Sequence, residues 1–181
     1  MLNGLSTFIL SEEDDRIFIL KGFAGTGKTT MINQLVTTLE LFSIPSVLLA
    51  PTGRAAKVLM NYSGKASFTI HKKIYRQKSQ ADGMGIFVLD KNLHKRTFFI
   101  VDEASMISNQ AAENSVFGSG RLLDDLLEYV YSGKECRLIL VGDTAQLPPV
   151  GISLSPALER ESVEASGFSV MEYELTDVVR Q

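Results

Sequence analysis

The chain has little of what marks secreted or membrane proteins. Its single cysteine, Cys136, can form neither an internal disulfide nor a zinc cluster. Cys136 begins the apolar run 136–141, where a small buried hydrophobe is its simplest role. One unpaired thiol favours a reducing, cytoplasmic setting. The N-terminal residues lack the basic start of a signal peptide, and no stretch approaches the roughly 18 consecutive apolar residues of a membrane span.

Length and composition indicate a globular protein. The chain has 181 residues, of which 45% are hydrophobic and 22% are charged. These values are ordinary for a folded domain and exclude disorder or a disulfide scaffold as its overall class. We therefore expect one domain that spans residues 1–181.

Charge is distributed unevenly along the chain. The formal net charge of −3 does not suggest nucleic acid as a partner, yet ten of the 18 Lys and Arg residues fall within 54–96. That block has only two acidic residues, Asp82 and Asp90, and the rest of the chain is strongly acidic. A basic block of this kind predicts a surface for a polyanion, although a merely solvated face remains the alternative.

Apolar runs alternate with helical patterns. We expect an α/β fold, a doubly wound parallel sheet with helices on both faces. Polar and Gly-rich stretches at 79–85 and 108–120 are expected to be surface loops. The predicted strands are 17–21, 46–50, 97–102, 137–143 and, at an edge, 170–175; the predicted helices are 28–42, 53–61, 69–77 and 121–131.

Informative residues follow the predicted strands. In open parallel sheets, ligands bind at the carboxyl ends of the strands. Gly22, Pro51, Asp102 and Asp143 each come at or directly after such an end. Their placement predicts a ligand site at this edge independently of any single motif.

The segment after the first strand predicts a phosphate-binding loop. Residues 22–29 read GFAGTGKT and match G-x-x-x-x-G-K-[ST] in full. Its glycines let backbone N–H groups point at phosphate oxygens. Lys28 would reach the β- and γ-phosphates of ATP, and the Thr29 hydroxyl would ligate Mg²⁺. The residues expected to bind the nucleotide are Gly22, Gly25, Thr26, Gly27, Lys28, Thr29 and Thr30.

Two later segments predict the reacting end of this site. Asp102 and Glu103 end the most apolar strand, and adjacent carboxylates there are costly without a cation nearby. Asp102 is suited to hold Mg²⁺, and Glu103 is suited to orient and deprotonate water. Gln146 follows the next strand and could sense the γ-phosphate by hydrogen bonding. A plain loop residue remains the alternative for Gln146.

Several motifs together resemble one protein family. GFAGTGKTT, APTGRAAKVL, TIHKKIY, VDEASM, GDTAQLPPVG and LTDVVRQ stand in the order of the motifs of superfamily 1 helicases, most similar to the 5′-to-3′ branch that includes RecD and Dda. The resemblance covers residues 18–181. It implies a RecA-like motor domain that works with a second one around a single ATP and tracks along single-stranded DNA.

The resemblance also implies roles for individual residues. Asp102 would hold Mg²⁺, Glu103 would activate water, Gln146 would couple the γ-phosphate to the DNA site, and Arg180 would reach the γ-phosphate. For His71, a structural histidine remains an equal alternative to DNA contact. The segments that resemble DNA-contacting motifs contribute Pro51, Thr52, Arg54, Thr69 and His71.

This chain departs from the family pattern in two ways. It has no glutamine before Gln34, whereas the family carries an adenine-reading glutamine ahead of the phosphate loop. It also ends where the second motor domain would begin, so we expect a first motor domain that binds nucleotide without unwinding a duplex. The alternatives are a stand-alone nucleotide-dependent switch, an RNA helicase of the same superfamily, and an α/β domain with a vestigial phosphate loop.

Overall fold

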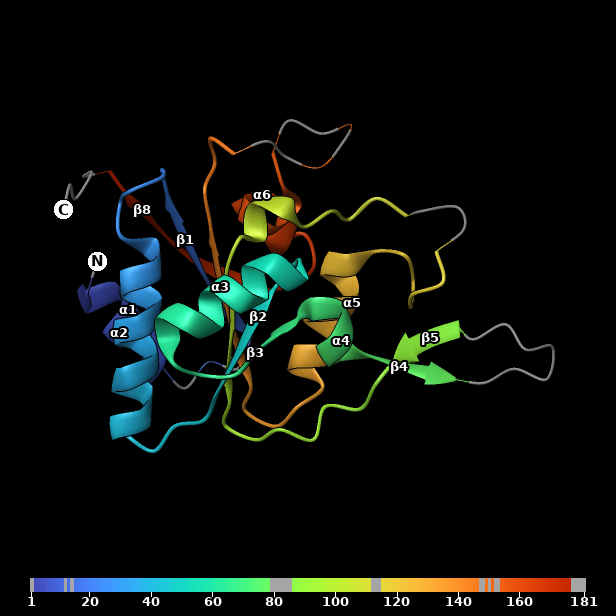
Figure 1. Cartoon of the computed structure of the whole chain (residues 1–181), viewed down its shortest axis with the longest axis horizontal. Helices are drawn as coiled ribbons and strands as arrows, with labels where there is room; N and C mark the ends of the chain where they lie inside the picture. Colours follow the sequence, from blue (N-terminus) through green and yellow to red (C-terminus); the bar gives the residue numbers. More distant parts are fainter. Residues whose placement is uncertain are drawn as a thin grey trace.

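A six-stranded parallel sheet forms the centre of the computed structural model (Figure 1). The structure describes residues 2–11, 13, 15–78, 86–111, 115–146, 149, 151 and 154–176. The strand order is β3-β2-β6-β7-β1-β8, and every neighbouring pair is parallel. The predicted doubly wound α/β fold is confirmed. The sheet strands are β1 (Arg16–Gly22), β2 (Ser46–Ala50), β3 (Ser67–Thr69), β6 (Phe98–Val101), β7 (Arg137–Gly142) and β8 (Ser169–Leu175).

Helices cover both faces of the sheet. One face packs against α1, α2 and α3, and the other packs against α4, α5 and α6 with two short 3₁₀ turns. The helices are α1 (Leu2–Leu10), α2 (Lys28–Leu41), α3 (Gly53–Ser63), α4 (Ile70–Ile74), α5 (Leu122–Tyr131) and α6 (Arg160–Glu164), and the 3₁₀ turns are η1 (Ala104–Met106) and η2 (Pro156–Leu158). None of these helices has the length and apolar character needed to cross a membrane.

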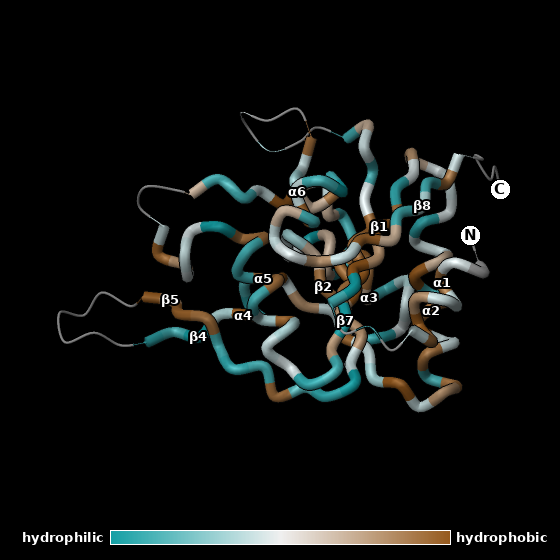
Figure 2. The backbone as a smooth tube through the Cα atoms, turned by 180° about the vertical axis from the view of Figure 1, so that it is seen from behind, coloured by the Kyte–Doolittle hydropathy of each residue, from teal (hydrophilic) through white to brown (hydrophobic). Residues whose placement is uncertain are grey.

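Each central strand is buried on both sides. In β1, Ile17 and Ile19 enter the core under α4 and α5, whereas Phe18 and Leu20 enter the core under α1 and α2. This alternation follows from the two-residue period of a strand. Figure 2 shows hydrophobic residues concentrated in the middle of the molecule. Two cores on opposite faces hold the sheet as a rigid support for its carboxyl edge.

Three of the four predicted helices are observed, and the one predicted over 69–77 is wrong in its last three residues. Instead of continuing through 69–77, α4 ends at Ile74, and the chain becomes strand β4 (Tyr75–Lys78). This strand pairs antiparallel with β5 (Ile86–Leu89), and the hairpin projects from the body in Figure 1. Pairing with a distant apolar segment overrides the weak local preference for helix.

The predicted loops are confirmed where the structure describes them. Residues 108–111 and 115–120 contain no helix or named strand, although Phe117 bridges to the hairpin through Phe87. The other predicted loop, 79–85, lies outside the described residues. Sequence patterns did not predict β3, which is only three residues long and partly exposed.

A buried carboxylate fixes the base of the hairpin. Asp125 of α5 is 4% exposed and accepts hydrogen bonds from the Tyr75 hydroxyl at 2.5 Å and from the backbone N–H of Ser119 at 3.0 Å. Burial, followed by the hydrogen bond to Asp125, raises the pKa of Tyr75 well above its usual range. Tyr75 therefore remains a donor at all physiological pH values, and α5, β4 and the 115–120 loop are joined at one point.

This contact predicts a stability change. Replacing Asp125 by alanine leaves the Tyr75 hydroxyl and the Ser119 N–H without their acceptor, so we expect a loss of about 2–3 kcal/mol in the free energy of unfolding. Urea unfolding of the chain would measure it. The matched control is Glu128→Ala, an exposed position on the same helix. Equal unfolding midpoints for the two variants would contradict the assigned role of Asp125.

Candidate active site

The phosphate-binding loop lies between β1 and α2, as predicted. Gly25 and Gly27 have φ angles of 80° and 90°, a region that side chains with a Cβ atom rarely adopt. Gly27 is the N-cap of α2 and offers no side-chain cap. The first backbone N–H groups of α2 therefore have no intrahelical acceptor and face an anion site. Thr26 is 5% exposed and stabilises the turn by donating to the Phe23 carbonyl at 2.8 Å.

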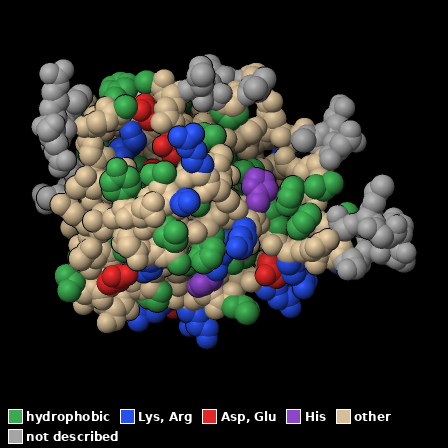
Figure 3. Space-filling model, in the orientation of Figure 1, with side chains coloured by type: hydrophobic (Ala, Val, Ile, Leu, Met, Phe, Trp, Pro, Cys, Tyr) green, Lys and Arg blue, Asp and Glu red, His purple; other side chains and the backbone are tan. Residues whose placement is uncertain are grey.

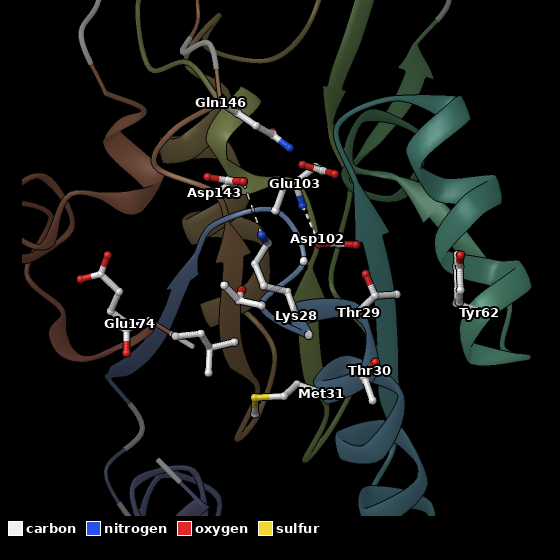
Figure 4. Close-up of a pocket in the computed structure, with 16 residues that line it drawn as sticks. Lys28, Thr29, Thr30, Met31, Tyr62, Asp102, Glu103, Asp143, Gln146 and Glu174 are labelled. Atoms are coloured by element: carbon white, nitrogen blue, oxygen red, sulfur yellow. Dashed lines mark hydrogen bonds and ion pairs between the residues drawn. The ribbon is translucent and has the colours of Figure 1, made fainter. Parts of the chain in front are cut away.

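Lys28 is held inside this loop. Its ammonium group donates to the carbonyls of Gly22 at 2.7 Å and Phe23 at 2.9 Å. It also lies 3.6 Å from the carboxylate of Asp143, which is 2% exposed and follows β7 (Figure 4). The loop thus has its own cation at the place where phosphates would need one.

Asp102 and Glu103 follow β6 at the same edge of the sheet. The backbone N–H of Asp102 donates to the Leu49 carbonyl of β2 at 3.0 Å, which fixes where β6 ends. Glu103 adopts φ 57° and ψ 37°, a left-handed conformation that costs a residue with a side chain about 1–2 kcal/mol. The backbone N–H of Glu103 donates to the Asp102 carboxylate at 2.9 Å. This sharp turn starts η1 and lets both carboxylates line one pocket.

Burial governs the charge of Asp102. Burial raises the pKa of Asp102 to about 6, the neighbouring Glu103 charge adds to the rise, and the N–H of Glu103 and Lys28 oppose it. One carboxylate oxygen of Glu103, Oε2, is buried without a hydrogen-bond partner among the described residues. Asp102 is therefore incompletely compensated by positive charge, and Glu103 Oε2 has no donor among the described residues, which fits a cation and a water molecule at this edge.

Gln146 lies at the mouth of the pocket. It follows the turn that Asp143 stabilises by accepting from the backbone N–H of Ala145 at 2.8 Å. The Gln146 side-chain oxygen accepts a hydrogen bond of 2.8 Å from the hydroxyl of Ser105 in η1. In Figure 4 the amide nitrogen of Gln146 is on the side of Glu103 and Lys28.

These elements enclose an open pocket of about 870 Å³. The residues predicted to bind or hydrolyse the nucleotide line this pocket, except Gly22, whose carbonyl accepts from Lys28, and Arg180, which lies outside the described residues. Figure 4 shows the Thr29 hydroxyl near the Asp102 carboxylate. The lining also includes Asp143, whose place after a strand pointed to this edge, and Tyr62 and Glu174, which sequence patterns did not single out.

The site residues fit a magnesium nucleotide. No group of three or more His, Cys, Asp or Glu side chains among the described residues could hold a metal by itself. A cation held only by Thr29 and Asp102 would need further oxygen ligands, which phosphates and water supply. The free N–H groups of the loop and the Lys28 ammonium suit the phosphates.

The predicted nucleic-acid residues lie at the ends of β2 and β3. These strands pair with Ala50 opposite Thr69, so the segments that follow them start side by side. Thr52 caps α3 by accepting from Ala55 N–H at 3.2 Å, and Thr69 caps α4 by accepting from Lys72 N–H at 3.1 Å. The structure thus gives both threonines a structural role and leaves their hydroxyl protons for another partner.

His71 is half-buried against aromatic side chains. Its ring meets that of Phe117 edge-on at 4.9 Å, and burial lowers its pKa, which favours the neutral imidazole at pH 7. Phe117 stacks in turn on Phe87 of the hairpin at 4.6 Å. The histidine therefore has a structural contact and remains partly exposed.

The basic block of 54–96 is not one continuous patch. Lys65, Arg76 and Arg96 are paired with Glu40, Asp90 and Glu135. In Figure 3 the Lys and Arg side chains are spread over the visible face. Three exposed cations close to the predicted contact segments have no ion pair within the described part of the chain: Arg54, Lys57 and Lys72.

Sequence and structure comparisons identify the family. A family model described as "AAA domain" matches residues 8–181. The chain belongs to this family. This AAA domain is 33% identical over 142 residues to the ATP-dependent RecD2 DNA helicase of Deinococcus radiodurans, and the match covers 77% of this chain and 17% of the relative. It is 32% identical over 151 residues to the ATP-dependent DNA helicase Pif1 of Bdellovibrio bacteriovorus, and this match covers 80% of this chain and 32% of the relative.

Solved Pif1 helicases share the fold of this AAA domain. One Bacteroides structure, in complex with ADP-AlF3 and ssDNA, superposes with a TM-score of 0.56 at 22% identity and covers 100% of this chain and 43% of that chain. Pif1 of Candida albicans gives a TM-score of 0.55 at 19% identity, over 99% of this chain and 40% of that one. The resemblance to RecD-like superfamily 1 helicases is confirmed, and this chain spans less than half the length of these relatives.

The raised pKa of Asp102 predicts a pH dependence of stability. The folded state binds this proton more tightly than the unfolded chain, so Asp102 destabilises the fold increasingly as pH rises from about 4 through about 6. Without Mg²⁺, Asp102→Asn should be more stable than the unmodified chain by about 1–3 kcal/mol at pH 7.5, and the difference should shrink at pH 5. Urea unfolding in a metal chelator measures this, with the exposed Glu128→Gln as control. A difference that is the same at both pH values would contradict the assignment.

Proposed function

We propose that this chain is the nucleotide-hydrolysing first motor domain of a superfamily 1 DNA helicase, and that it uses Mg²⁺ and ATP. The observation that carries the proposal is the meeting of Lys28, Glu103 and Gln146 around one pocket at the carboxyl edge of the sheet. The similarity to the RecD2 and Pif1 helicases supports it, as does the ADP-AlF3 that one Pif1 structure contains.

The residues that line the pocket would have separate roles in ATP hydrolysis. The N–H groups of the loop and Lys28 hold the phosphates and neutralise charge that develops on them. Glu103 orients a water molecule and accepts its proton as the water oxygen bonds to the γ-phosphorus and the bond to ADP breaks. Thr29 and Asp102 would hold Mg²⁺, and the chemistry it would supply is neutralisation of phosphate charge. Gln146 would donate to the γ-phosphate, and Arg180 would contact it.

The sheet connects this reaction to the proposed nucleic-acid contacts. The hydrogen bond from Asp102 N–H to the Leu49 carbonyl joins the metal-binding end of β6 to β2. Pro51 and Thr52 follow two and three residues after Leu49, and we propose that they contact the backbone of single-stranded DNA. Thr69 and His71 would continue that contact from the neighbouring strand.

We propose DNA rather than RNA as the partner, and the cytoplasm as the compartment in which the protein acts.

A complete motor needs a second domain. We propose that a second motor domain completes the nucleotide site with arginines, which in comparable sites contribute roughly 10³–10⁵ in rate. Its movement relative to this domain as ATP turns over would drive translocation. This chain alone would then bind nucleotide and hydrolyse it slowly or not at all.

Turnover of the full-length protein tests the proposal. We expect ATP hydrolysis that single-stranded DNA stimulates, with Glu103→Gln lowering kcat by about 10²–10⁴-fold while Mg·ATP still binds. Lys28→Ala should abolish Mg·ATP binding itself. Lys134→Ala, an exposed lysine just before β7, is the matched control and should behave like the unmodified protein. Unchanged ATP affinity in Lys28→Ala would refute the site. An oligomer that forms only with ATP, together with turnover that DNA does not affect, would favour a nucleotide-dependent switch.

Salt dependence tests the nucleic-acid surface. Arg54→Ala and Lys72→Ala should each weaken binding of a dT oligonucleotide and reduce the slope of log affinity against log salt by about 0.7 per lost phosphate contact. Lys95→Ala, an exposed position before β6, should leave both unchanged. Binding curves in 50–200 mM salt measure the slopes. If all three variants behave alike, the surface is wrongly assigned, and if poly(U) outcompetes dT, RNA is the partner.

A further inference from the structure

Gln146 lies in an unusual setting for a residue that must sense a phosphate. Its side chain is exposed, and it belongs to a loop rather than to a helix or strand. A free glutamine side chain loses up to about 2 kcal/mol of rotamer entropy when it is fixed. Something must hold the carboxamide in place if it is to meet the nucleotide in one orientation.

Ser105 provides the hydrogen bond that does so. Its hydroxyl lies 2.8 Å from Gln146 Oε1, and within the described part of the chain this is the hydrogen bond that the Gln146 side chain makes. Ser105 itself is 2% exposed. A buried hydroxyl needs an acceptor, and the Gln146 oxygen is the acceptor it has, so the hydroxyl donates and Oε1 accepts.

The orientation of the carboxamide follows from this bond. With Oε1 bound to Ser105, the Nε2 group has no acceptor among the residues that the structure describes, so its N–H donors can face a ligand. Figure 4 shows Nε2 turned toward Glu103 and Lys28, where the γ-phosphate would lie. A flipped amide would present an oxygen to the phosphate, and two acceptors repel each other.

Ser105 is itself rigidly mounted. It lies in η1 two residues after Glu103, between the buried residues Ala104 and Ile107. The fully buried hydroxyl of Ser155 binds the carbonyls of Ala104 at 2.9 Å and Ile107 at 2.7 Å, which ties η1 to η2. The turn that carries the water-activating carboxylate therefore also carries the anchor of the phosphate sensor.

Resting on the function proposed above, we propose that Ser105 is a positioning residue that holds the Gln146 carboxamide with its donors toward the γ-phosphate. Ser105 acts through Gln146 and does not contact the nucleotide. Through it, the loop after β7 and the turn after β6 keep one relative position. Its loss would therefore affect turnover and its stimulation by DNA, and leave the binding of Mg·ATP intact.

The test compares Ser105→Ala with Gln146→Ala and the double variant in the full-length protein. Loss of one hydrogen bond predicts that Ser105→Ala lowers DNA-stimulated kcat about 3- to 10-fold, with the affinity for a fluorescent ATP analogue unchanged within about twofold. The double variant should be no slower than Gln146→Ala, because both substitutions remove the same contact. Ser105→Cys, which keeps the size and a weak donor, should recover part of the rate.

Ser108→Ala is the matched control, since this serine follows closely in the same segment and, within the described residues, its hydroxyl accepts from the backbone N–H of Gln110 and not from Gln146. It should retain full turnover. If the unmodified protein is active and Ser105→Ala has the same kcat, the positioning role alone is overturned. The same holds if the fold reductions in kcat of the two single variants multiply in the double variant. Weaker ATP binding in Ser105→Ala would also overturn it. No turnover in the unmodified protein would overturn the proposed function and this inference together.

Discussion

The parallel pairing of β6, β7 and β1 is the constraint on which the site depends. β1 pairs with β7 from Ile17 opposite Leu138 to Lys21 opposite Gly142, and β7 pairs with β6 up to Val101 opposite Leu140. Because these strands run in the same direction and end at similar heights, the residues that follow them arrive at one edge. The phosphate loop, the two carboxylates and the glutamine loop meet there although they are far apart in sequence.

The same arrangement concentrates unfavourable electrostatics in a small volume. Four carboxylates and one lysine line a pocket at the end of a sheet that is apolar on both faces. Asp102 is partly desolvated, and Glu103 has a left-handed backbone and an oxygen without a partner among the described residues. Of the described side chains that line the pocket, Lys28 alone carries positive charge. The two hydrophobic cores hold this arrangement in place, so the site is shaped before any ligand arrives.

Sequence patterns predicted the central sheet and most of the pocket, because both depend on local signals. Continuous apolar runs identify buried strands, and the glycine spacing of the phosphate loop follows from backbone geometry. What they did not predict depends on contacts across the chain. α4 ends at Ile74 because the hydroxyl of Tyr75 donates a hydrogen bond to Asp125 and because β4 pairs with β5. The contact of Ser105 with Gln146 joins residues 41 positions apart, and no periodicity reports such a pair.

The conformation of the Lys28 side chain affects how a phosphate group would bind in the loop. In this structure the ammonium group is already satisfied by the carbonyls of Gly22 and Phe23 and is close to Asp143. An arriving phosphate does not meet a bare cation, because it has to displace partners from the protein's own chain. Binding is therefore an exchange of ligands around one nitrogen, and its net free energy is the difference between two sets of contacts. These carbonyls and Asp143 compete with any arriving anion for the same nitrogen, which lowers the net affinity of the loop and eases release.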